Sequence, residues 1–552
     1  MVKKILNHKS KTIFSAAFVL GAAALTSRIL GLIRDRLLAG KFGAGNELDI
    51  YFAAFRLPDL IYSILIMGAI SSAFIPVFAE YFQKDSPSHQ CIDGGGKKEA
   101  WHLTSGLFNL VSVILIVLAI VFIVLAPWLV SLVAPGFSGI KREMTILLTR
   151  IMFLSPLLLG MSSILSGILQ YFHRFFIYSL APVMYNIGII IGILFFVPLW
   201  GLVGLAWGVV LGAGLHLLIQ LPSALYSGFR LTKVLKFFHP GIQKIVKLMI
   251  PRTIGLAGSQ INFLVITAIA STLVSGSIAV FNLSHNLYWV PIGIVGVSFA
   301  TATFPRLARS FAKEEKEKFS KNFSSVFSQI LYLVLPITVL FFLLRAQIVR
   351  IILGTGEFSW VDTRLTAAAL GIFSLSVFAQ SLIPLISRAF YAFQNTKTPV
   401  LVSLWSIGLN ILGSFFFVWA LGNGNWFSSF VSQILKLQDI NNFAVLGLPI
   451  AFTLAGIFNF IVLLKVFDKK IKYWQPSKIL DSLWKIILAC LLMAITIYAL
   501  LYVLDLFLNT RTFIGIFFQA AIASIAGIII YFVSTLLLKS PESVALIKKI
   551  FK

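Results

Sequence analysis

Long runs of apolar residues follow one another along almost the whole chain, and short polar or basic segments separate them. Most runs reach the length of about 20 residues that an α-helix needs to cross a bilayer. The pattern predicts fourteen membrane helices, at approximately 13–37, 47–82, 103–134, 143–171, 176–199, 201–226, 249–273, 277–311, 323–352, 363–393, 398–421, 443–466, 480–505 and 513–537.

Composition supports the same class of protein. Of the 552 residues, 59% are hydrophobic and only 12% are charged, and the mean hydropathy is +0.96. A soluble domain carries about 25% charged residues, so we predict an all-α polytopic membrane protein. The two cysteines, Cys91 and Cys490, lie far apart, and we expect neither a disulfide nor a metal site from them.

The net charge of +26 reflects topology. Most of the Lys and Arg residues lie in the two terminal tails and in every second loop, which is the distribution expected of cytoplasmic segments. The clear basic residues of the opposite loops are Lys41, Lys141, Arg142, Lys436 and Arg511. We therefore predict that both termini are cytoplasmic, that the basic segments contact anionic membrane lipids, and that nucleic acid is not a partner.

The first predicted helix carries charged residues on one face. Small and charged side chains recur there every three or four residues, a spacing that puts them on one stripe of a helix. They are Gly21, Ala24, Arg28, Gly31 and Asp35. The next helix repeats the pattern with Asp49 and Arg56. A charge at mid-membrane costs about 2.5–3.5 kcal/mol on insertion scales, so such residues face water, a partner or a ligand. We interpret the stripe as the wall of a polar cavity.

Three short segments recur in the same order in the second half of the chain. They begin at Arg28, Ala73 and Ala181, and their counterparts begin at Arg252, Ala302 and Thr398. This repeat predicts two six-helix lobes related by a pseudo-twofold axis along the membrane normal, plus a C-terminal helix pair. We expect an N-terminal lobe at 1–229, a basic linker at 230–247, a C-terminal lobe at 248–467, and helices 13 and 14 with a basic tail at 468–552. Helix 7 continues the polar stripe with Arg252, Gly255, Ser259 and Asn262.

Several motifs of the first two helices resemble a known family. They are Ser27-Arg28-Ile-Leu-Gly31-Leu-Ile-Arg34-Asp35, Phe42-Gly43-Ala44-Gly45 with Asp49, Phe55-Arg56-Leu57-Pro58, and Ala73-Phe74-Ile-Pro76. Ala134-Pro135-Gly136-Phe137 and Lys397-Thr398-Pro399-Val400 match later in the chain. Together they resemble the MurJ (MviN) family, over nearly the whole chain.

The resemblance implies the V-shaped, MATE-like fold of the MOP exporter superfamily. It also implies a transporter of the bacterial inner membrane that flips the peptidoglycan precursor lipid II to the periplasmic leaflet by alternating access. Such a protein is not an enzyme and needs no cofactor, and helices 13 and 14 form a groove for the polyprenyl tail. We expect a monomer, with wall-synthesis or division complexes as further partners. The family's cavity residues carry over to Ser27, Arg28, Arg34, Asp35 and Asp49, with Arg56 at a usually basic position.

The chain departs from the family pattern at several of these positions. Tyr62-Ser63 stands where a further arginine is usual, Met67 replaces a glutamate, and Asn286 lies near the position of an arginine in helix 8. Arg252 is a candidate substitute. Some family members bind sodium through carboxylates of helices 7 and 11, where this chain has only Asn262 and Asn410, so sodium coupling is not expected.

The chemistry of lipid II suits these residues. Its diphosphate cannot cross about 30 Å of hydrocarbon unaided, because desolvation of the anion costs too much. Arginine offers planar, permanently charged donors for phosphate. The expected diphosphate ligands are Arg28, Arg34, Arg56 and Arg252, with Asp35 and Asp49 holding the arginines when the site is empty. The sequence has no P-loop, metal-binding motif or nucleophilic triad.

Other interpretations remain open. The protein could flip another polyprenyl-diphosphate-linked glycan of the O-antigen or teichuronic type, act as a drug/cation antiporter of the same fold, or be a non-transporting scaffold for wall-synthesis enzymes. Arg34 and Arg252 could reach the membrane surface from helix ends, and Asp35 could be a structural partner of an arginine. His216 and Gln220 are expected to form interhelical hydrogen bonds.

Overall fold

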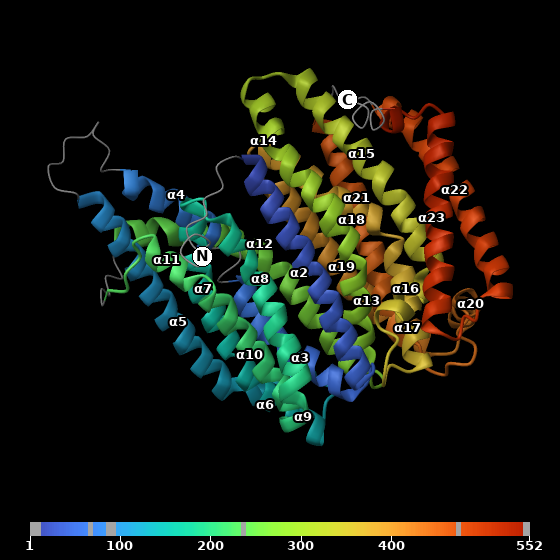
Figure 1. Cartoon of the computed structure of the whole chain (residues 1–552), viewed down its shortest axis with the longest axis horizontal. Helices are drawn as coiled ribbons and strands as arrows, with labels where there is room; N and C mark the ends of the chain where they lie inside the picture. Colours follow the sequence, from blue (N-terminus) through green and yellow to red (C-terminus); the bar gives the residue numbers. More distant parts are fainter. Residues whose placement is uncertain (1–12, 65–69, 84–94, 233–238, 471–475, 545–552) are drawn as a thin grey trace. The chain divides into compact units, whose positions relative to one another are not determined.

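The computed structural model describes residues 13–64, 70–83, 95–232, 239–470 and 476–544. Every regular element in these ranges is a helix (Figure 1), which confirms the predicted all-α class. The chain forms two compact units: Met1–Leu38 with Gly45–Ile278, and Ala39–Ala44 with Ala279–Lys552. The lobe boundaries at 229 and 467 stay a prediction, since the units follow packing rather than the sequence repeat.

The first unit contains the helices from α2 to α12. Their bounds are α2 (Ile13–Phe42, whose last residues belong to the second unit), α3 (Asn46–Tyr62), α4 (Ile70–Gln83), α5 (Gly95–Val133), α6 (Gly139–Met152), α7 (Leu154–Tyr171), α8 (Phe175–Ile191), the π-turn η2 (Gly192–Phe196), α9 (Val197–Trp200), α10 (Leu202–Leu218), α11 (Leu221–Tyr226) and α12 (Pro240–Ser271). The helix predicted at 143–171 is thus divided between α6 and α7.

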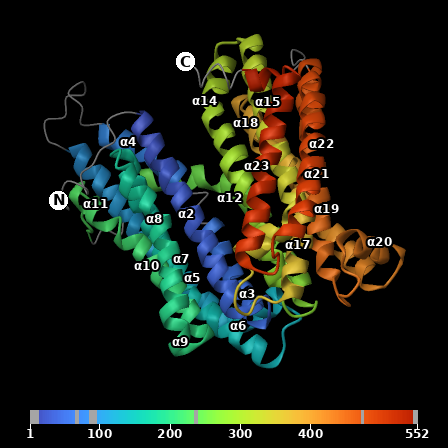
Figure 2. The same cartoon turned by 45° about the vertical axis from the view of Figure 1, so that its right-hand side comes forward.

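The second unit contains the remaining helices. They are α13 (Ser277–Pro291), the π-turn η3 (Ile292–Val297), α14 (Ser298–Ala312), α15 (Lys316–Leu343), α16 (Arg345–Ile352), α17 (Trp360–Ser374), α18 (Val377–Ala392), α19 (Lys397–Gly422), α20 (Trp426–Leu435), the 3₁₀ turn η4 (Ala444–Leu446), α21 (Gly447–Lys470), α22 (Pro476–Phe507) and α23 (Phe513–Leu537). Figure 2 shows α22 and α23 running side by side. The sequence pattern did not predict α20, and the helix predicted at 363–393 is bent by 45° between α17 and α18.

Membrane-spanning length and apolarity are met by ten helices of the described ranges, or by eleven spans if α17 and α18 count as one. α2, α3 and α12 are not among them, although each lies where a span was predicted. The structure is therefore that of a polytopic membrane protein, and the count of fourteen stays a prediction.

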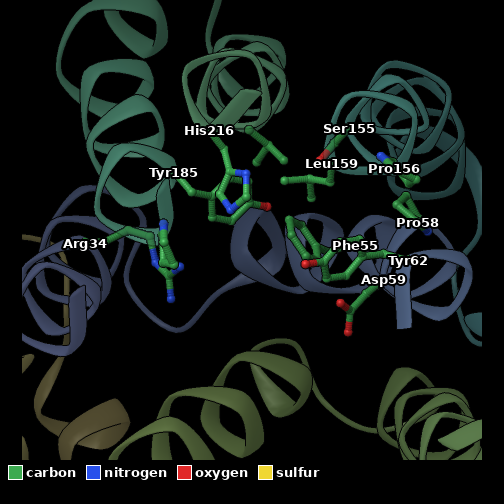
Figure 3. A pocket seen from close by; sticks show the side chains of 12 residues that line it. Arg34, Phe55, Pro58, Asp59, Tyr62, Ser155, Pro156, Leu159, Tyr185 and His216 are labelled. Carbon is green, nitrogen blue, oxygen red and sulfur yellow. The ribbon is translucent and has the colours of Figure 1, made fainter. Parts of the chain in front are cut away.

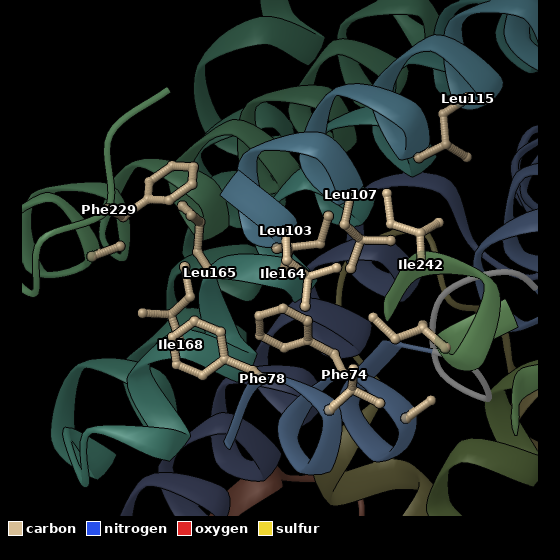
Figure 4. Close-up of a cluster of buried hydrophobic side chains, with 14 of the residues drawn as sticks. Phe74, Phe78, Leu103, Leu107, Leu115, Ile164, Leu165, Ile168, Phe229 and Ile242 are labelled. Carbon is tan, nitrogen blue, oxygen red and sulfur yellow. The ribbon is translucent and has the colours of Figure 1, made fainter. Parts of the chain in front are cut away.

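A buried cluster of aromatic and aliphatic side chains packs several helices of the first unit together. Phe74 and Phe78 of α4 are fully buried against Leu103 of α5 and Ile164 of α7 (Figure 4). Ile242, at the start of α12, belongs to the same cluster. This core ties α12 to α4 and α5, so the first turns of α12 pack as part of the first unit.

Glycines bring α8 and α10 into backbone contact. A Cβ atom added at Gly188 would lie 2.3 Å from the Cα atom of Gly212, and one added at Gly192 would lie 2.4 Å from the Cα atom of Gly208. Small residues allow this approach in membranes, where packing rather than the hydrophobic effect joins helices. The contact places Tyr185 of α8 beside Val209 and His216 of α10, and these three residues line one pocket.

Candidate functional site

Arg34, near the end of α2, is the centre of a polar cluster in the first unit. Its Nε and Nη2 atoms donate to Oδ1 of Asp35 at 3.0 and 2.8 Å, and its Nη1 donates to Oδ1 of Asn186 on α8 at 3.1 Å. The Asn186 amide in turn donates to Oγ of Ser27 at 3.2 Å. Three of the predicted site residues, Ser27, Arg34 and Asp35, are therefore brought together, and Asn186 is the partner that joins them to α8.

The charges of this cluster compensate one another. The Asp35 side chain is only 5% exposed and the Arg34 side chain 22%. An unpaired charge at this depth would carry a large desolvation cost, and the adjacent opposite charge reduces it. Three of the Arg34 N–H groups are used by Asp35 and Asn186, so the rest of the five-donor guanidinium can contact a ligand.

A pocket of about 270 Å³ adjoins Arg34. Figure 3 shows Arg34 and Tyr185 on one side of this pocket, and Asp59 and Tyr62 of α3 on the other. Other lining residues are Phe55, Pro58, Ser155, Pro156, Leu159, Pro182, Val209 and His216. Pockets for drug-sized ligands measure about 300–1,000 Å³. The pocket can therefore hold the charged part of a ligand rather than a whole glycolipid.

His216 is held in this wall by its neighbours. Its Nδ1 lies 2.7 Å from Oγ of Ser162 on α7, and the Gln220 amide donates to the same Ser162 oxygen at 2.7 Å. Gln220 also accepts from Oγ of Ser166 at 2.7 Å. The predicted interhelical hydrogen bonds of His216 and Gln220 are confirmed.

Arg56 lies on α3 and contacts α12. Its Nε donates to Oγ1 of Thr267 at 2.8 Å, and its guanidinium carbon lies 5.3 Å from the centre of the Phe263 ring. Both contacts are ones that arginine makes well, a hydrogen bond and a cation–π interaction. Asn262, another predicted site residue, is 7% exposed on the same helix. Helices 2 and 7 of the sequence prediction are thus joined by polar contacts at Arg56.

Asp49 is held by two donors. It accepts from Nζ of Lys141 at 3.1 Å and from the backbone N–H of Gly276 at 2.8 Å, and it is 2% exposed. Lys141 also donates to Asn46 Oδ1 at 2.8 Å. The sequence analysis counted Lys141 only as a basic loop residue. Basic residues are few in the loops on that side, and this could have marked Lys141 as a partner for the Asp49 carboxylate. In this conformation Asp49 joins α3 to α6 and to the turn before α13.

The other predicted site residues lie apart from this cluster or outside the description. Arg28 is half-buried on α2, and no hydrogen bond or ion pair joins its guanidinium to another residue in the described ranges. The Arg252 side chain and Met67 lie outside the described residues. Asn286 is half-buried on α13 in the second unit, next to His285, whose ring stacks on Phe281.

Comparison with known proteins places this architecture. The chain matches the family described as "Lipid II flippase MurJ" over residues 38–424. It is 30% identical over 499 residues to the "Probable lipid II flippase MurJ" of Buchnera aphidicola subsp. Acyrthosiphon pisum, covering 89% of this chain and 90% of that protein. It is 27% identical over 419 residues to the "Lipid II flippase MurJ" of Burkholderia cenocepacia, covering 74% of this chain and 79% of that protein.

Solved structures agree with the sequence relatives. A structure described as "Lipid II flippase MurJ, inward closed conformation" superposes with a TM-score of 0.74 at 25% identity, and covers 96% of this chain and all of that one. An inward-facing MATE family transporter of the MOP superfamily has a TM-score of 0.63 at 14% identity, covering 81% of this chain and 95% of that one, which shows a shared fold. Since the family match spans most of the chain and the relatives align with it nearly end to end, the chain belongs to the MurJ lipid II flippase family.

Proposed function

We propose that this protein flips lipid II from the cytoplasmic to the periplasmic leaflet of a bacterial cytoplasmic membrane. Membership of the MurJ family supports lipid II as the substrate. The shared fold with MATE transporters supports alternating access between two related lobes, and identifies the protein as a transporter rather than an enzyme.

The observation that carries the binding step is the charge-compensated cluster of Arg34, Asp35 and Asn186 beside the pocket. We infer that the diphosphate of the lipid binds Arg34 through the donors that Asp35 and Asn186 leave unused, and then competes with Asp35 for the rest. Charge-assisted hydrogen bonds from guanidinium to phosphate are among the strong ones. Ser27, Arg28, Asp49, Arg56, Arg252, Asn262 and Asn286 remain proposed members of the same substrate path.

The topology and the two lobes are proposed from the distribution of Lys and Arg residues and from the internal sequence repeat. We propose that both termini are cytoplasmic, that residues 1–229 and 248–467 are the two moving lobes, and that the protein works as a monomer on anionic membranes. Contacts with wall-synthesis or division proteins belong to the same proposal.

Complementation tests the proposal directly. The full chain is expressed in a bacterium depleted of its own lipid II flippase, together with Arg34→Ala, Arg34→Lys and Arg28→Ala. Arg150→Ala is the matched control, because Arg150 is an exposed arginine of the same unit whose Nε donates to a backbone carbonyl. We expect the parent and Arg150→Ala to restore growth and Arg34→Ala to fail at equal membrane levels. Arg34→Lys should fall between them, since lysine lacks the planar fork.

Two results would contradict the proposal. Full rescue by both Arg34→Ala and Arg28→Ala would remove the arginines from the binding step and favour a scaffold. Failure of a correctly inserted parent chain, combined with rescue of a strain that lacks the flippase for another polyprenyl-diphosphate glycan, would assign the protein to that substrate.

A further inference from the structure

A second cavity lies in the second unit, where α22 ends and α23 begins. It has a volume of about 360 Å³. Its walls come from α16, the start of α17, the last turns of α22 and the first turns of α23 (Figure 1 labels these helices). The spans Ile479–Phe507 and Phe513–Leu537 end and begin at this level, so the cavity lies at a membrane–water boundary. It is distinct from the Arg34 pocket, which belongs to the first unit.

Arg350 supplies a positive charge to this cavity. Its Nη1 and Nη2 donate to the backbone carbonyls of Thr510 and Arg511 at 3.1 and 2.9 Å, and its guanidinium carbon lies 5.4 Å from the centre of the Trp360 ring. No ion pair with a carboxylate is formed by Arg350 within the described residues. Backbone carbonyls supply no counter-charge, and two hydrogen bonds leave part of the five-donor guanidinium of this lining residue for a ligand.

Two residues that carry acceptor atoms line the same cavity. Asp505 accepts from Oγ1 of Thr510 at 2.8 Å through one oxygen only. The Gln347 amide donates to Oε1 of Gln519 at 3.4 Å, which leaves the Gln347 Oε1 atom enclosed and without a hydrogen-bond partner among the described residues. A buried acceptor without a donor is costly, but this atom is enclosed by protein and is not open to the cavity. The cavity therefore presents one cation, Arg350, and one exposed carboxylate, Asp505.

The surface around the opening is aromatic. Tyr498 is 70% exposed and Tyr502 73% exposed, both on α22 and both lining the cavity, and Trp360 at the edge is 59% exposed. Tyr and Trp concentrate where lipid headgroups meet acyl chains. The volume equals that of about a dozen water molecules at roughly 30 Å³ each, which suits a compact lipid headgroup.

We propose that this cavity binds the headgroup of phosphatidylethanolamine from the surrounding bilayer. The phosphodiester would accept from Arg350, and the ammonium group would donate to the carboxylate of Asp505, which is exposed and lines the cavity. Phosphatidylcholine has the same phosphate and charge but no N–H, so it cannot donate to this carboxylate. Phosphatidylglycerol offers hydroxyl donors but brings a net negative charge towards Asp505.

Lipid binding to the purified full-length protein tests this. The three phospholipids, with identical acyl chains, are titrated in detergent and retained lipid is counted by native mass spectrometry. We expect phosphatidylethanolamine to bind about tenfold more tightly than phosphatidylcholine, a difference equal to about 1.4 kcal/mol. Asp505→Asn should reduce this preference and leave phosphatidylcholine binding unchanged. Arg511→Gln is the control, since only the backbone of Arg511 contacts Arg350.

The outcomes separate this inference from the flippase activity. Equal binding of phosphatidylethanolamine and phosphatidylcholine to the parent protein would overturn the proposed headgroup specificity. A preference for phosphatidylglycerol would overturn it as well. Both measurements use the parent protein, so neither depends on the folding of a variant. Displacement of phosphatidylethanolamine by lipid II at stoichiometric amounts would assign the cavity to the substrate path and also overturn it. Complementation by the parent chain reports on transport independently.

Discussion

Glycine contacts between α8 and α10 predict a large effect from a single methyl group. In Gly192→Ala the new Cβ atom would lie 2.4 Å from the Cα atom of Gly208. Two carbon atoms pack best at about 3.5–4.0 Å, so the helices would have to separate by more than about 1 Å at this level. The atom in the way belongs to the backbone, and no side-chain rotation can remove it.

Overpacking of this kind costs about 1–3 kcal/mol. In a membrane the loss is not offset elsewhere, because lipid is as apolar as the separated surfaces and no hydrophobic effect drives the helices together again. The same separation would move Tyr185, whose backbone oxygen would lie 2.5 Å from a Cβ atom at Gly212. Since Tyr185 lines the Arg34 pocket, Gly192→Ala should lower both stability and transport.

The loss of stability is measured by thermal unfolding in detergent. The readout is the fraction of protein that remains monodisperse after heating. Gly214→Ala is the matched control, because it lies on α10 and a Cβ atom there would have nothing within 4 Å. This control should be neutral or slightly stabilising, since alanine favours helix over glycine by about 1 kcal/mol. Equal midpoints for Gly192→Ala and Gly214→Ala would refute the inferred contact.

Three further substitutions test contacts at other places. Lys141→Met should lower the thermal midpoint, because it removes the lysine that forms an ion pair with the buried Asp49 carboxylate, and adding Asp49→Asn should recover part of the loss. Asp362→Ala should destabilise the second unit by about 1–2 kcal/mol, as it removes the side-chain acceptor of two backbone donors, the Ser359 N–H in the capping box of α17 and the Ala44 N–H; an unchanged midpoint would show that these bonds contribute little. Thr267→Val should weaken complementation without loss of membrane protein, since it removes one hydrogen-bond acceptor of the Arg56 guanidinium, and normal growth would argue against a role of this bond in transport.

Hydropathy located the helices well because a chain in lipid must satisfy its backbone groups within each span. The predicted 513–537 and the observed α23 coincide. Asp35 was identified from the spacing of the stripe, whereas Arg34 was identified only from the resemblance of its motif to the family. Hydropathy could not show that Arg34 is joined to Asn186, 152 residues later. Nor did it separate α6 from α7, because no Gly or polar loop divides them and a single residue, Phe153, lies between the two helices. Partners across the fold depend on packing, which a one-dimensional pattern does not contain.

The adjacency of Arg34 and Asp35 has a consequence for alternating access. A transporter must keep its mid-membrane charges compensated in every conformation, and contacts between helices change as the helices move. Arg34 and Asp35 are neighbours on one helix, so their ion pair survives any rearrangement that leaves α2 intact. Arg56, in contrast, also donates a hydrogen bond to Thr267 of another helix, and that contact can change when the helices move. In the proposed binding step, a diphosphate would therefore contact all donors of Arg34 only by displacing Asp35, and the return of Asp35 to Arg34 would make release of the diphosphate more favourable. An arginine with no carboxylate beside it would bind the anion more tightly and let it go more slowly.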